Sequence, residues 1–302
     1  MTARTVQAPA ELLAFLFAEW PEVKKKRIRT WLKFRAVTVN GVPVTQFDHA
    51  LHPGDVVELR AGQAPARKSE FASGLRILFE DDSLLVVEKP AGLLSIATES
   101  EHVQRTAYRE LTDYLRDAPT RRRQRVWIVH RLDRETSGLM LFAKTAAAKS
   151  TLQQGWDDVV KRYQAVVEGA PGAEQGTFES DLNEASPSKV FSAPPSEHTR
   201  HAITRYRVLA RSGARTLVEL TLVTGRRHQI RVHLADAGCP VIGDKKYGAK
   251  TDPAGRLALH ACRLAFRHPE TQKSIAFDSP LPADLARLVS PIAPQRRSGR
   301  SR

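Results

Sequence analysis

The chain has 302 residues, enough for two domains, and 41% of them are hydrophobic, which is ordinary for a globular protein. Lysine and arginine number 47 against 33 aspartates and glutamates, and the resulting net charge of +14 favours binding to phosphate backbones. The two cysteines form no C-x-x-C pair and no apolar run approaches the roughly 20 residues that span a bilayer, so we expect no disulfide framework, cysteine-rich zinc site, membrane insertion or export.

The first 60 residues predict a small module of two helices and two strands. Helical patterns cover residues 12–20 and 26–34, while residues 37–44 predict a strand with a turn and residues 53–59 a second strand. The sequences VNG and PGDVV in these strand regions resemble segments of the S4 RNA-binding module. The R-L-D opening of that module is absent, and residues 24–27 replace its Ser-Arg pair. The resemblance implies an S4-like fold.

The next 65 or so residues join this module to the first informative motif. Residues 61–74 predict a linker, because their first ten positions are polar, carry Gly and Pro and show no periodicity. Residues 77–87 predict a strand that leads into the turn EKPAG at 88–92. The basic run RRRQR at 121–125 is a candidate RNA contact.

The segment VHRLDRETSGL at residues 129–139 places four charged residues between two apolar runs, 126–129 and 139–143. The apolar runs predict strands buried on two faces, and Ser137-Gly138 predicts a turn between them. Asp133 lies between two arginines in the sequence, which would favour its ionised form if they fold near it. An ionised carboxylate can act as a nucleophile or base, and the alternative is an ordinary solvated turn.

Residues 161–169 (KRYQAVVEG) predict a strand that carries a second candidate. Tyr163, Ala165 and Val167 alternate and so lie on one side of it. Taken alone, a tyrosine in such a strand belongs more often to the core than to an active site.

Residues 224–234 (TGRRHQIRVHL) follow an alternating strand at 217–223 and open a helix that Gly238 is placed to end. The residues expected on its apolar face are Ile230, Leu234 and Ala237. The basic residues at its start are either solvated or functional.

Three segments resemble, in order, the motifs of the RluA-type pseudouridine synthases: HRLDxxTSGL at 130–139, K-x-Y at 161–163 and GRxHQIRVH at 225–233. Further family-like segments lie at 88–92, 242–248 and 257–266, so the resemblance spans about residues 75–283. It implies an α+β pseudouridine synthase fold, with a mixed, mostly antiparallel sheet and a basic central cleft lined by the three motifs.

The same resemblance implies roles for individual residues. Asp133 is the catalytic aspartate, Tyr163 stacks against the target base, and Arg231 is the salt-bridge partner of Asp133, with Arg226 as second choice. Arg131 is expected to enter the RNA where the target uridine is flipped out. The other residues expected to bind RNA are His130, Lys161, Arg226, His228 and Gln229.

The reaction implied by the resemblance explains these residue types. Uridine becomes pseudouridine when the base leaves C1′ at N1, rotates and rejoins through C5, with no redox change, so no cofactor is needed. The site must supply an ionised nucleophile, an apolar wall and a charge partner, which are the roles of Asp133, Tyr163 and Arg231. Removal of the C5 proton by Tyr163 is a further hypothesis, although a phenol with a pKa near ~10 would need help.

Two other functions compete with this interpretation. A glycoside hydrolase could use Asp133 and Glu135, but two carboxylates on one tight turn are poorly placed to flank a scissile bond. The more serious alternative is a catalytically silent RNA-binding or ribosome-assembly protein, against which the intact motif residues argue. His228 and His233 are five residues apart, which does not suit shared metal ligation, so we expect no metal site.

The sequence therefore predicts four parts: an S4-like RNA-binding module at 1–60, a linker at 61–74, a catalytic domain at 75–290 and a basic, disordered tail at 291–302. We expect a monomeric, cytoplasmic enzyme that acts on ribosomal or transfer RNA and does not bind membranes.

Overall fold

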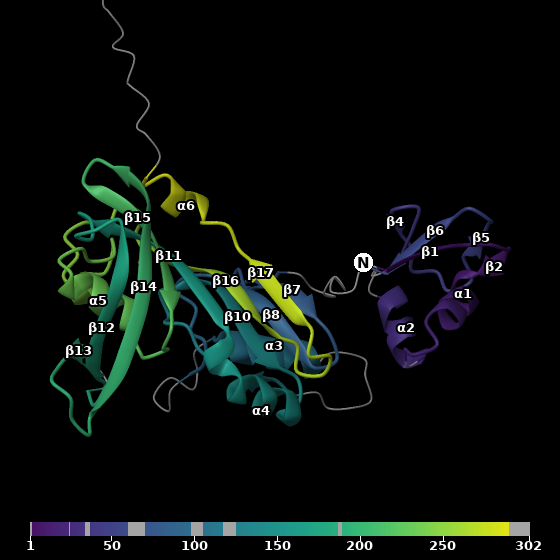
Figure 1. The fold of residues 1–302 in the computed structure, drawn as a ribbon, viewed down its shortest axis with the longest axis horizontal. Coiled ribbons are helices and arrows are strands. Elements are labelled where there is room, and N and C mark those ends of the chain that lie inside the picture. The colour runs from purple at the N-terminus through teal and green to yellow at the C-terminus, as the bar shows by residue number, and fades with distance from the viewer. Residues whose placement is uncertain are drawn as a thin grey trace, which may run out of the picture.

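The computed structural model describes residues 2–23, 25–33, 37–59, 70–97, 105–116, 125–186 and 189–289. Figure 1 shows a small unit formed by the N-terminal residues and a larger unit built on a long sheet. Most of the predicted linker, most of the basic run at 121–125 and the whole predicted tail lie outside the described residues.

The N-terminal unit combines two helices with a small sheet. Its elements are β1 (Thr2–Thr5), β2 (Ala10–Glu11), α1 (Leu12–Glu19), α2 (Lys25–Lys33), β3 (Val37–Val39), β4 (Val42–Pro43), β5 (Ala50–Leu51) and β6 (Val56–Leu59). The sheet order is β1-β6-β3-β4, and β2 pairs with β5 as a separate ribbon. The predicted helices and strands are confirmed, with helix ends within one residue of those expected.

Apolar residues of both helices meet the inner face of this sheet. The buried side chains of this core include Leu12, Leu16, Ile28, Leu32 and Val57. Between β3 and β4, Asn40 (φ 51°) and Gly41 (φ 80°) adopt the left-handed conformation. A two-residue hairpin turn needs this conformation at both positions, and Asn-Gly adopts it readily.

The large unit is built on an eleven-stranded sheet. In spatial order its strands are β13 (Phe191–Ser192), β12 (Gln175–Asn183), β14 (Thr199–Ser212), β15 (Arg215–Leu222), β11 (Val160–Glu168), β16 (Leu259–Arg267), β10 (Ser137–Ala143), β8 (Leu84–Lys89) and β7 (Arg76–Glu80), with β17 (Ser274–Asp278) on β16 and β9 (Trp127–Ile128) on β10. Among the described strands, β10 and β16 run parallel, while the other neighbours are antiparallel. The predicted mixed, mostly antiparallel sheet is thus confirmed.

Helices cover both faces of the part of the sheet around β8 and β10. They are α3 (Ala107–Arg116) and α4 (Ala146–Gln154). On one face Met140 packs in a cluster with α3, and on the other Leu141 packs in a cluster with α4. Burial on both faces is why the apolar run in β10 does not alternate with polar residues.

On the other half of the sheet, α5 (Gln229–Asp236) contacts β12 and β14, and α6 (Ala283–Ala286) packs through Leu285 in a cluster with β11 and β15. Two short 3-10 turns are η2 (Trp156–Asp158) and η3 (Lys245–Tyr247).

Residues 77–87 form a hairpin, so the prediction of one continuous strand is wrong. Strand β7 ends at Glu80 and β8 begins at Leu84. Between them, the Asp81 carboxylate accepts hydrogen bonds from the backbone N–H groups of Ser83 (2.8 Å) and Leu84 (2.9 Å). An aspartate that bonds the backbone two and three residues ahead closes a turn.

Ser137 and Gly138 do not form the predicted turn but open strand β10. Gly138 (φ 114°) pairs with Ala261 of β16, and a side chain at this glycine would collide with the Ala261 carbonyl. The glycine is therefore required for the close approach of two strands rather than for a turn.

Two smaller differences concern element ends. Ala237 is exposed and follows the last turn of α5, so it does not share the buried face, while Gly238 (φ 73°) ends the helix as predicted. Phe71 lies in the predicted linker, yet its ring contacts Tyr114 of α3 edge-on, with the centroids 5.9 Å apart. The described end of that segment thus packs with the large unit.

Strand β16 joins the two halves of the sheet. It lies between β11 and β10, and its residue Ala261 pairs with Tyr163 on one side and with Gly138 on the other. The strand that carries Tyr163 and the strand that follows the Asp133 loop are therefore held at a fixed separation by one residue of a third strand.

Candidate active site

The loop at residues 129–136 connects β9 to β10, and the neighbouring turn holds its backbone in place. Ser95 Oγ accepts from the Leu132 N–H (3.1 Å) and donates to the Leu132 carbonyl (2.7 Å). The ammonium of Lys89 donates to the carbonyls of Pro90, Leu93 and Arg134 at 2.8–3.0 Å. Burial lowers the pKa of Lys89 to about 7, but three carbonyl acceptors require all three protons of the charged form.

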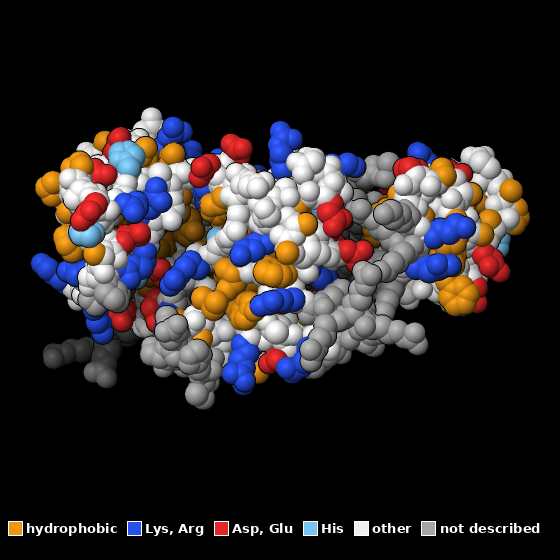
Figure 2. Space-filling view, turned by 90° about the horizontal axis from the view of Figure 1, so that it is seen from below, with side chains coloured by type: hydrophobic (Ala, Val, Ile, Leu, Met, Phe, Trp, Pro, Cys, Tyr) orange, Lys and Arg blue, Asp and Glu red, His pale blue; other side chains and the backbone are white. Residues whose placement is uncertain are grey.

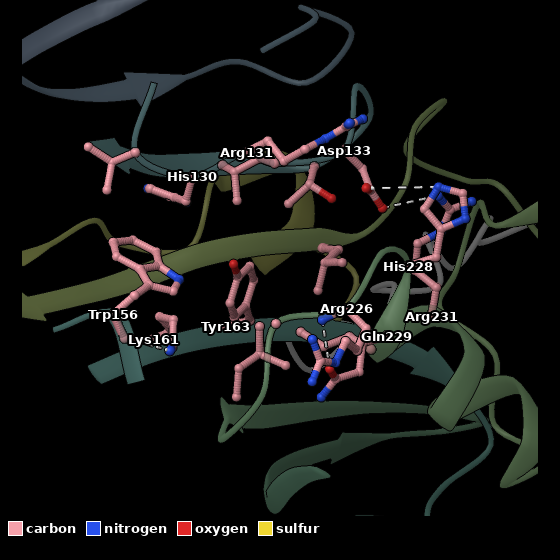
Figure 3. Close-up of a pocket in the computed structure, with 17 residues that line it drawn as sticks. His130, Arg131, Asp133, Trp156, Lys161, Tyr163, Arg226, His228, Gln229 and Arg231 are labelled. Carbon is pink, nitrogen blue, oxygen red and sulfur yellow. Dashed lines mark hydrogen bonds and ion pairs between the residues drawn. The ribbon is translucent and has the colours of Figure 1, made fainter. Parts of the chain in front are cut away.

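Asp133 and Arg231 face each other across the site. Arg231 Nη1 donates to Asp133 Oδ2 at 3.2 Å, and His228 Nε2 lies 3.9 Å from Oδ1 (Figure 3). Arg226 instead donates to the His201 carbonyl at 3.0 Å, so the first choice of partner is confirmed and the second is wrong. Arg134 likewise contacts Gly92 and Glu135, and among the described residues it forms no hydrogen bond or ion pair with Asp133.

Asp244 fixes the guanidinium of Arg231. Its carboxylate accepts from Arg231 Nε (2.6 Å) and Nη2 (2.8 Å), and its side chain is only 1% exposed. Burial lowers the pKa of Arg231, but the hydrogen bonds and negative charges of Asp244 and Asp133 outweigh burial and raise it. Arg231 is thus a permanent cation held between two carboxylates, with Nη1 left for Asp133.

The three motifs line one pocket of about 290 Å³. That volume lies near the lower end of small-molecule sites, roughly 300–1,000 Å³, and suits a single base. The charged side chains of its lining are Asp133, Arg131, Lys161, Arg226 and Arg231. The predicted shared, basic cleft is thereby confirmed. Figure 2 shows Lys and Arg side chains spread over the face of the molecule seen from below.

Tyr163 stands in the middle of this pocket (Figure 3). Tyr163 packs against two apolar clusters, one of which contains Ile230 and the other Ala261. Burial, and then the negative charge of Asp133, raise the pKa of Tyr163. The phenol stays protonated at neutral pH, which argues against the hypothesis that it removes the C5 proton and favours the role of a wall.

Trp156 forms the end of the pocket together with two predicted site residues. The His130 ring stacks on Trp156 with centroids 4.6 Å apart, and its Nε2 accepts from the Leu141 N–H at 3.0 Å. Lys161 donates to the Trp156 carbonyl at 2.9 Å and lies over its ring. Burial lowers the pKa of His130 to about 3, so its imidazole is neutral. We therefore expect His130 to support the wall rather than bind phosphate.

Gln229 shapes the turn before α5. Its amide oxygen accepts from Thr224 Oγ1 (2.8 Å) and the Arg226 N–H (2.9 Å), and its amide nitrogen donates to the Ile203 carbonyl and Thr204 Oγ1, both at 2.9 Å. These four bonds use the hydrogen-bonding capacity of the side chain. We expect Gln229 to position Arg226 rather than to contact RNA.

The two histidines of the third motif have different surroundings. His233 is buried and bonds Thr204 Oγ1 (2.9 Å) and Ser180 Oγ (3.2 Å), which is a structural role, whereas His228 faces Asp133. Within the described ranges, no three His, Cys, Asp or Glu side chains are grouped as metal ligands would be. Among the described residues, no helix is both long enough and apolar enough to cross a membrane.

Sequence reasoning missed Trp156, Asp244 and Tyr247 as parts of the site. Trp156 lies in a short 3-10 turn without a motif, so nothing in the sequence marked it. Asp244 and Tyr247 belong to a segment whose family resemblance was noted without a role for either residue. Their pairing with residues of α5 depends on tertiary contacts alone.

The fold and the site together define an enzyme of the pseudouridine synthase class, and comparison with known proteins agrees. Residues 83–236 match the model of the RNA pseudouridylate synthase family. A Neisseria meningitidis protein named ribosomal large subunit pseudouridine synthase D is 34% identical over 299 residues, covering 94% of this chain and 79% of its own. An uncharacterized RNA pseudouridine synthase of Bacillus subtilis, YlyB, is 34% identical over 96% of both chains.

A solved structure supports the same assignment. The human RNA pseudouridylate synthase domain containing 4 has a TM-score of 0.59 and 27% identity, covering 70% of this chain and 90% of its own. The chain belongs to the RNA pseudouridylate synthase family, of the RluA type that the motifs resemble. It is an RNA-modifying isomerase, so neither the silent RNA-binding protein nor the glycoside hydrolase describes it.

Proposed function

We propose that the enzyme converts a uridine of large-subunit ribosomal RNA to pseudouridine with Asp133 as the nucleophile. The observation that carries this proposal is the Asp133 carboxylate, paired with Arg231 at the edge of a base-sized pocket that contains Tyr163. The choice of RNA rests on the relatives named for the ribosomal large subunit. Transfer RNA is the second candidate.

In this proposal the side chains divide the work. The Asp133 carboxylate adds to the ribose or the pyrimidine ring, the C1′–N1 bond breaks, and the freed base turns against the Tyr163 ring. A C1′–C5 bond then forms, the bond to Asp133 breaks and releases the carboxylate, C5 loses its proton and N1 gains one, so no atom enters or leaves overall. Arg231 pairs with the carboxylate and orients it, and the pocket keeps the free base from escaping.

The RNA-facing surface is the second part of the proposal. Arg131 is exposed at the pocket, and Lys161 and Arg226 line it, so these cations would contact the phosphates or bases around the flipped uridine. We further propose that residues 1–60 act as an S4-like RNA-binding module beside the catalytic unit. The enzyme would work as a monomer in the cytoplasm, where ribosomal RNA is modified.

Pseudouridine mapping tests the choice of RNA. In cells that lack the gene, one or more pseudouridines of large-subunit ribosomal RNA should disappear, and the wild-type gene should restore them. The Asp133→Asn gene, expressed at the same level, should not. Loss of a transfer RNA pseudouridine with an unchanged ribosomal pattern would refute the proposed substrate while leaving the chemistry intact.

Replacement of Arg131 by alanine should separate base flipping from chemistry. A long planar cation can fill the gap left by an extruded base, and extrusion from a structured RNA costs a few kcal/mol. Arg131→Ala should therefore lose most of its single-turnover rate on a stem-loop target and much less on an unstructured oligonucleotide. Equal losses on both RNAs would mean that Arg131 only steadies the loop.

Deletion of residues 1–60 should affect RNA binding more than chemistry. The N-terminal unit has its own core, and its removal also takes away exposed cations such as Lys25 and Arg29. We expect weaker binding with a smaller salt dependence, and slow conversion of a short stem-loop at saturating RNA. A folded truncated enzyme without activity at saturating RNA would show that the module does more than bind.

A further inference from the structure

Tyr247 contacts both groups that face the Asp133 carboxylate. The guanidinium carbon of Arg231 lies 4.9 Å from the centre of the Tyr247 ring, and the Tyr247 hydroxyl lies 2.8 Å from His228 Nδ1. The tyrosine is itself fixed, because it is buried and its hydroxyl accepts a hydrogen bond from the Val190 N–H at 3.1 Å. It does not line the pocket, so it cannot touch the substrate there.

The hydrogen bonds determine where the proton of His228 lies. A tyrosine hydroxyl has one proton, and burial raises the pKa of Tyr247, so the proton is retained. Among the described residues, His228 Nδ1 is the acceptor available to the Tyr247 hydroxyl, so in the arrangement that we infer the hydroxyl donates its proton to that nitrogen. Burial, helped by nearby cations such as Arg231, lowers the pKa of His228 to about 4 against the opposing effect of Asp133. The imidazole is thus neutral, and in the inferred arrangement its proton lies on Nε2.

The backbone at His228 brings this N–H to the carboxylate. His228 has φ 55° and ψ 14°, a left-handed conformation that residues other than glycine adopt infrequently, immediately before α5. From there Nε2 lies 3.9 Å from Asp133 Oδ1. This separation exceeds a hydrogen bond. The N–H therefore faces Oδ1 without forming a hydrogen bond to it, while Arg231 donates a hydrogen bond to Oδ2.

We propose that Tyr247 is a positioning residue for the catalytic carboxylate, with its ring face orienting Arg231 toward Oδ2 and its hydroxyl orienting the Nε2–H of His228 toward Oδ1. The inference rests on the proposed role of Asp133 as nucleophile. It also reassigns His228, expected from the family resemblance to bind RNA, to the carboxylate side of the site.

The hydroxyl and the ring of Tyr247 can be removed in two steps. Tyr247→Phe keeps the ring beneath Arg231 and removes the hydroxyl with its bonds to His228 and to the Val190 N–H, whereas Tyr247→Leu removes the ring as well. At saturating RNA we expect kcat to fall about 10-fold for Tyr247→Phe and about 100-fold for Tyr247→Leu, with RNA affinity unchanged. Tyr206→Phe is the matched control, because Tyr206 stacks on Phe178 away from Asp133 and should keep wild-type kcat.

Nitrogen NMR of the histidine rings supplies a measurement that does not depend on activity. In the wild-type protein His228 should be the neutral Nε2–H tautomer, and in Tyr247→Phe this preference should be lost. If His228 carries its proton on Nδ1 in the wild type, or if Tyr247→Phe retains full kcat, the inference is overturned. If Tyr247→Leu fails to fold, the phenylalanine variant and the tautomer measurement still decide.

Measuring Asp133→Asn beside these variants distinguishes the two levels of the proposal. An active Asp133→Asn enzyme would refute the nucleophile role, whatever the Tyr247 variants do. An inactive Asp133→Asn enzyme together with a fully active Tyr247→Phe enzyme would refute only the positioning role of Tyr247.

Discussion

The Asp133→Asn variant should lose uridine conversion by on the order of 10⁴-fold or more while it binds RNA as the wild type does. The amide is nearly isosteric with the carboxylate but has no ionised oxygen to attack with. It can still accept the hydrogen bond from Arg231, so the loop and the pocket should keep their shape. Single-turnover assays and RNA titrations on the same preparation measure both quantities.

Asp158→Asn is the matched control for this substitution. Asp158 is an exposed carboxylate on the 3-10 turn that also holds Trp156, and its loss should leave the rate unchanged. Mass spectrometry must exclude deamidation of the new asparagine, which would regenerate the nucleophile. Measurable turnover by intact Asp133→Asn protein would remove Asp133 from the nucleophile role.

The Arg231→Met variant should be both inactive and much less stable. Arg231 is the cation between Asp133 and Asp244, and Asp244 is only 1% exposed, so methionine would leave a buried carboxylate without its partner. Breaking a buried ion pair from one side costs about 3–5 kcal/mol of unfolding free energy. Urea unfolding followed by circular dichroism measures this loss.

A second substitution separates stability from catalysis at this position. Adding Asp244→Asn to Arg231→Met removes the unpaired charge, so much of the lost stability should return. Activity should not return, because Asp133 still lacks its cation. If the single variant unfolds at the wild-type urea concentration, Arg231 and Asp244 do not form the buried pair described above.

Much of the fold was predictable because its signals are local. The two helices and the strands β3 and β6 of the N-terminal unit follow from apolar periodicity, and the Asn-Gly turn follows from the backbone freedom of those two residues, whereas the short strands β1, β2 and β5 were not predicted. The sequence did not predict the hairpin at 77–87, because both of its strands are apolar and only a few polar residues separate them. The turn depends on the hydrogen bonds of the Asp81 carboxylate, which the sequence pattern does not show. Gly138 was misread because a glycine that allows two strands to approach looks like a turn glycine in sequence.

The site was predictable where a motif carried it and not elsewhere. Asp133 and Arg231 are 98 positions apart, and only the family resemblance suggested that they pair. Gln229 and His130 have side chains typical of RNA contacts, but internal hydrogen bonds use the amide of Gln229 and the Nε2 atom of His130, which depends on what the fold places beside them. The roles of Asp244 and Tyr247 are likewise tertiary, since each acts through a side chain of α5 or the residue before it.

The position of β16 determines when the enzyme can first become active. The three motif segments end at residue 233, so all of them are synthesised before Leu259–Arg267. Until that strand arrives, β10 and β11 have no common neighbour, and Asp133 and Tyr163 have nothing to hold them at a working distance. Pairing between segments so far apart in sequence is slow to form. We therefore expect a chain that ends before β16 to be inactive although it contains all three motif segments, so that synthesis of the C-terminal part completes the assembly of the site.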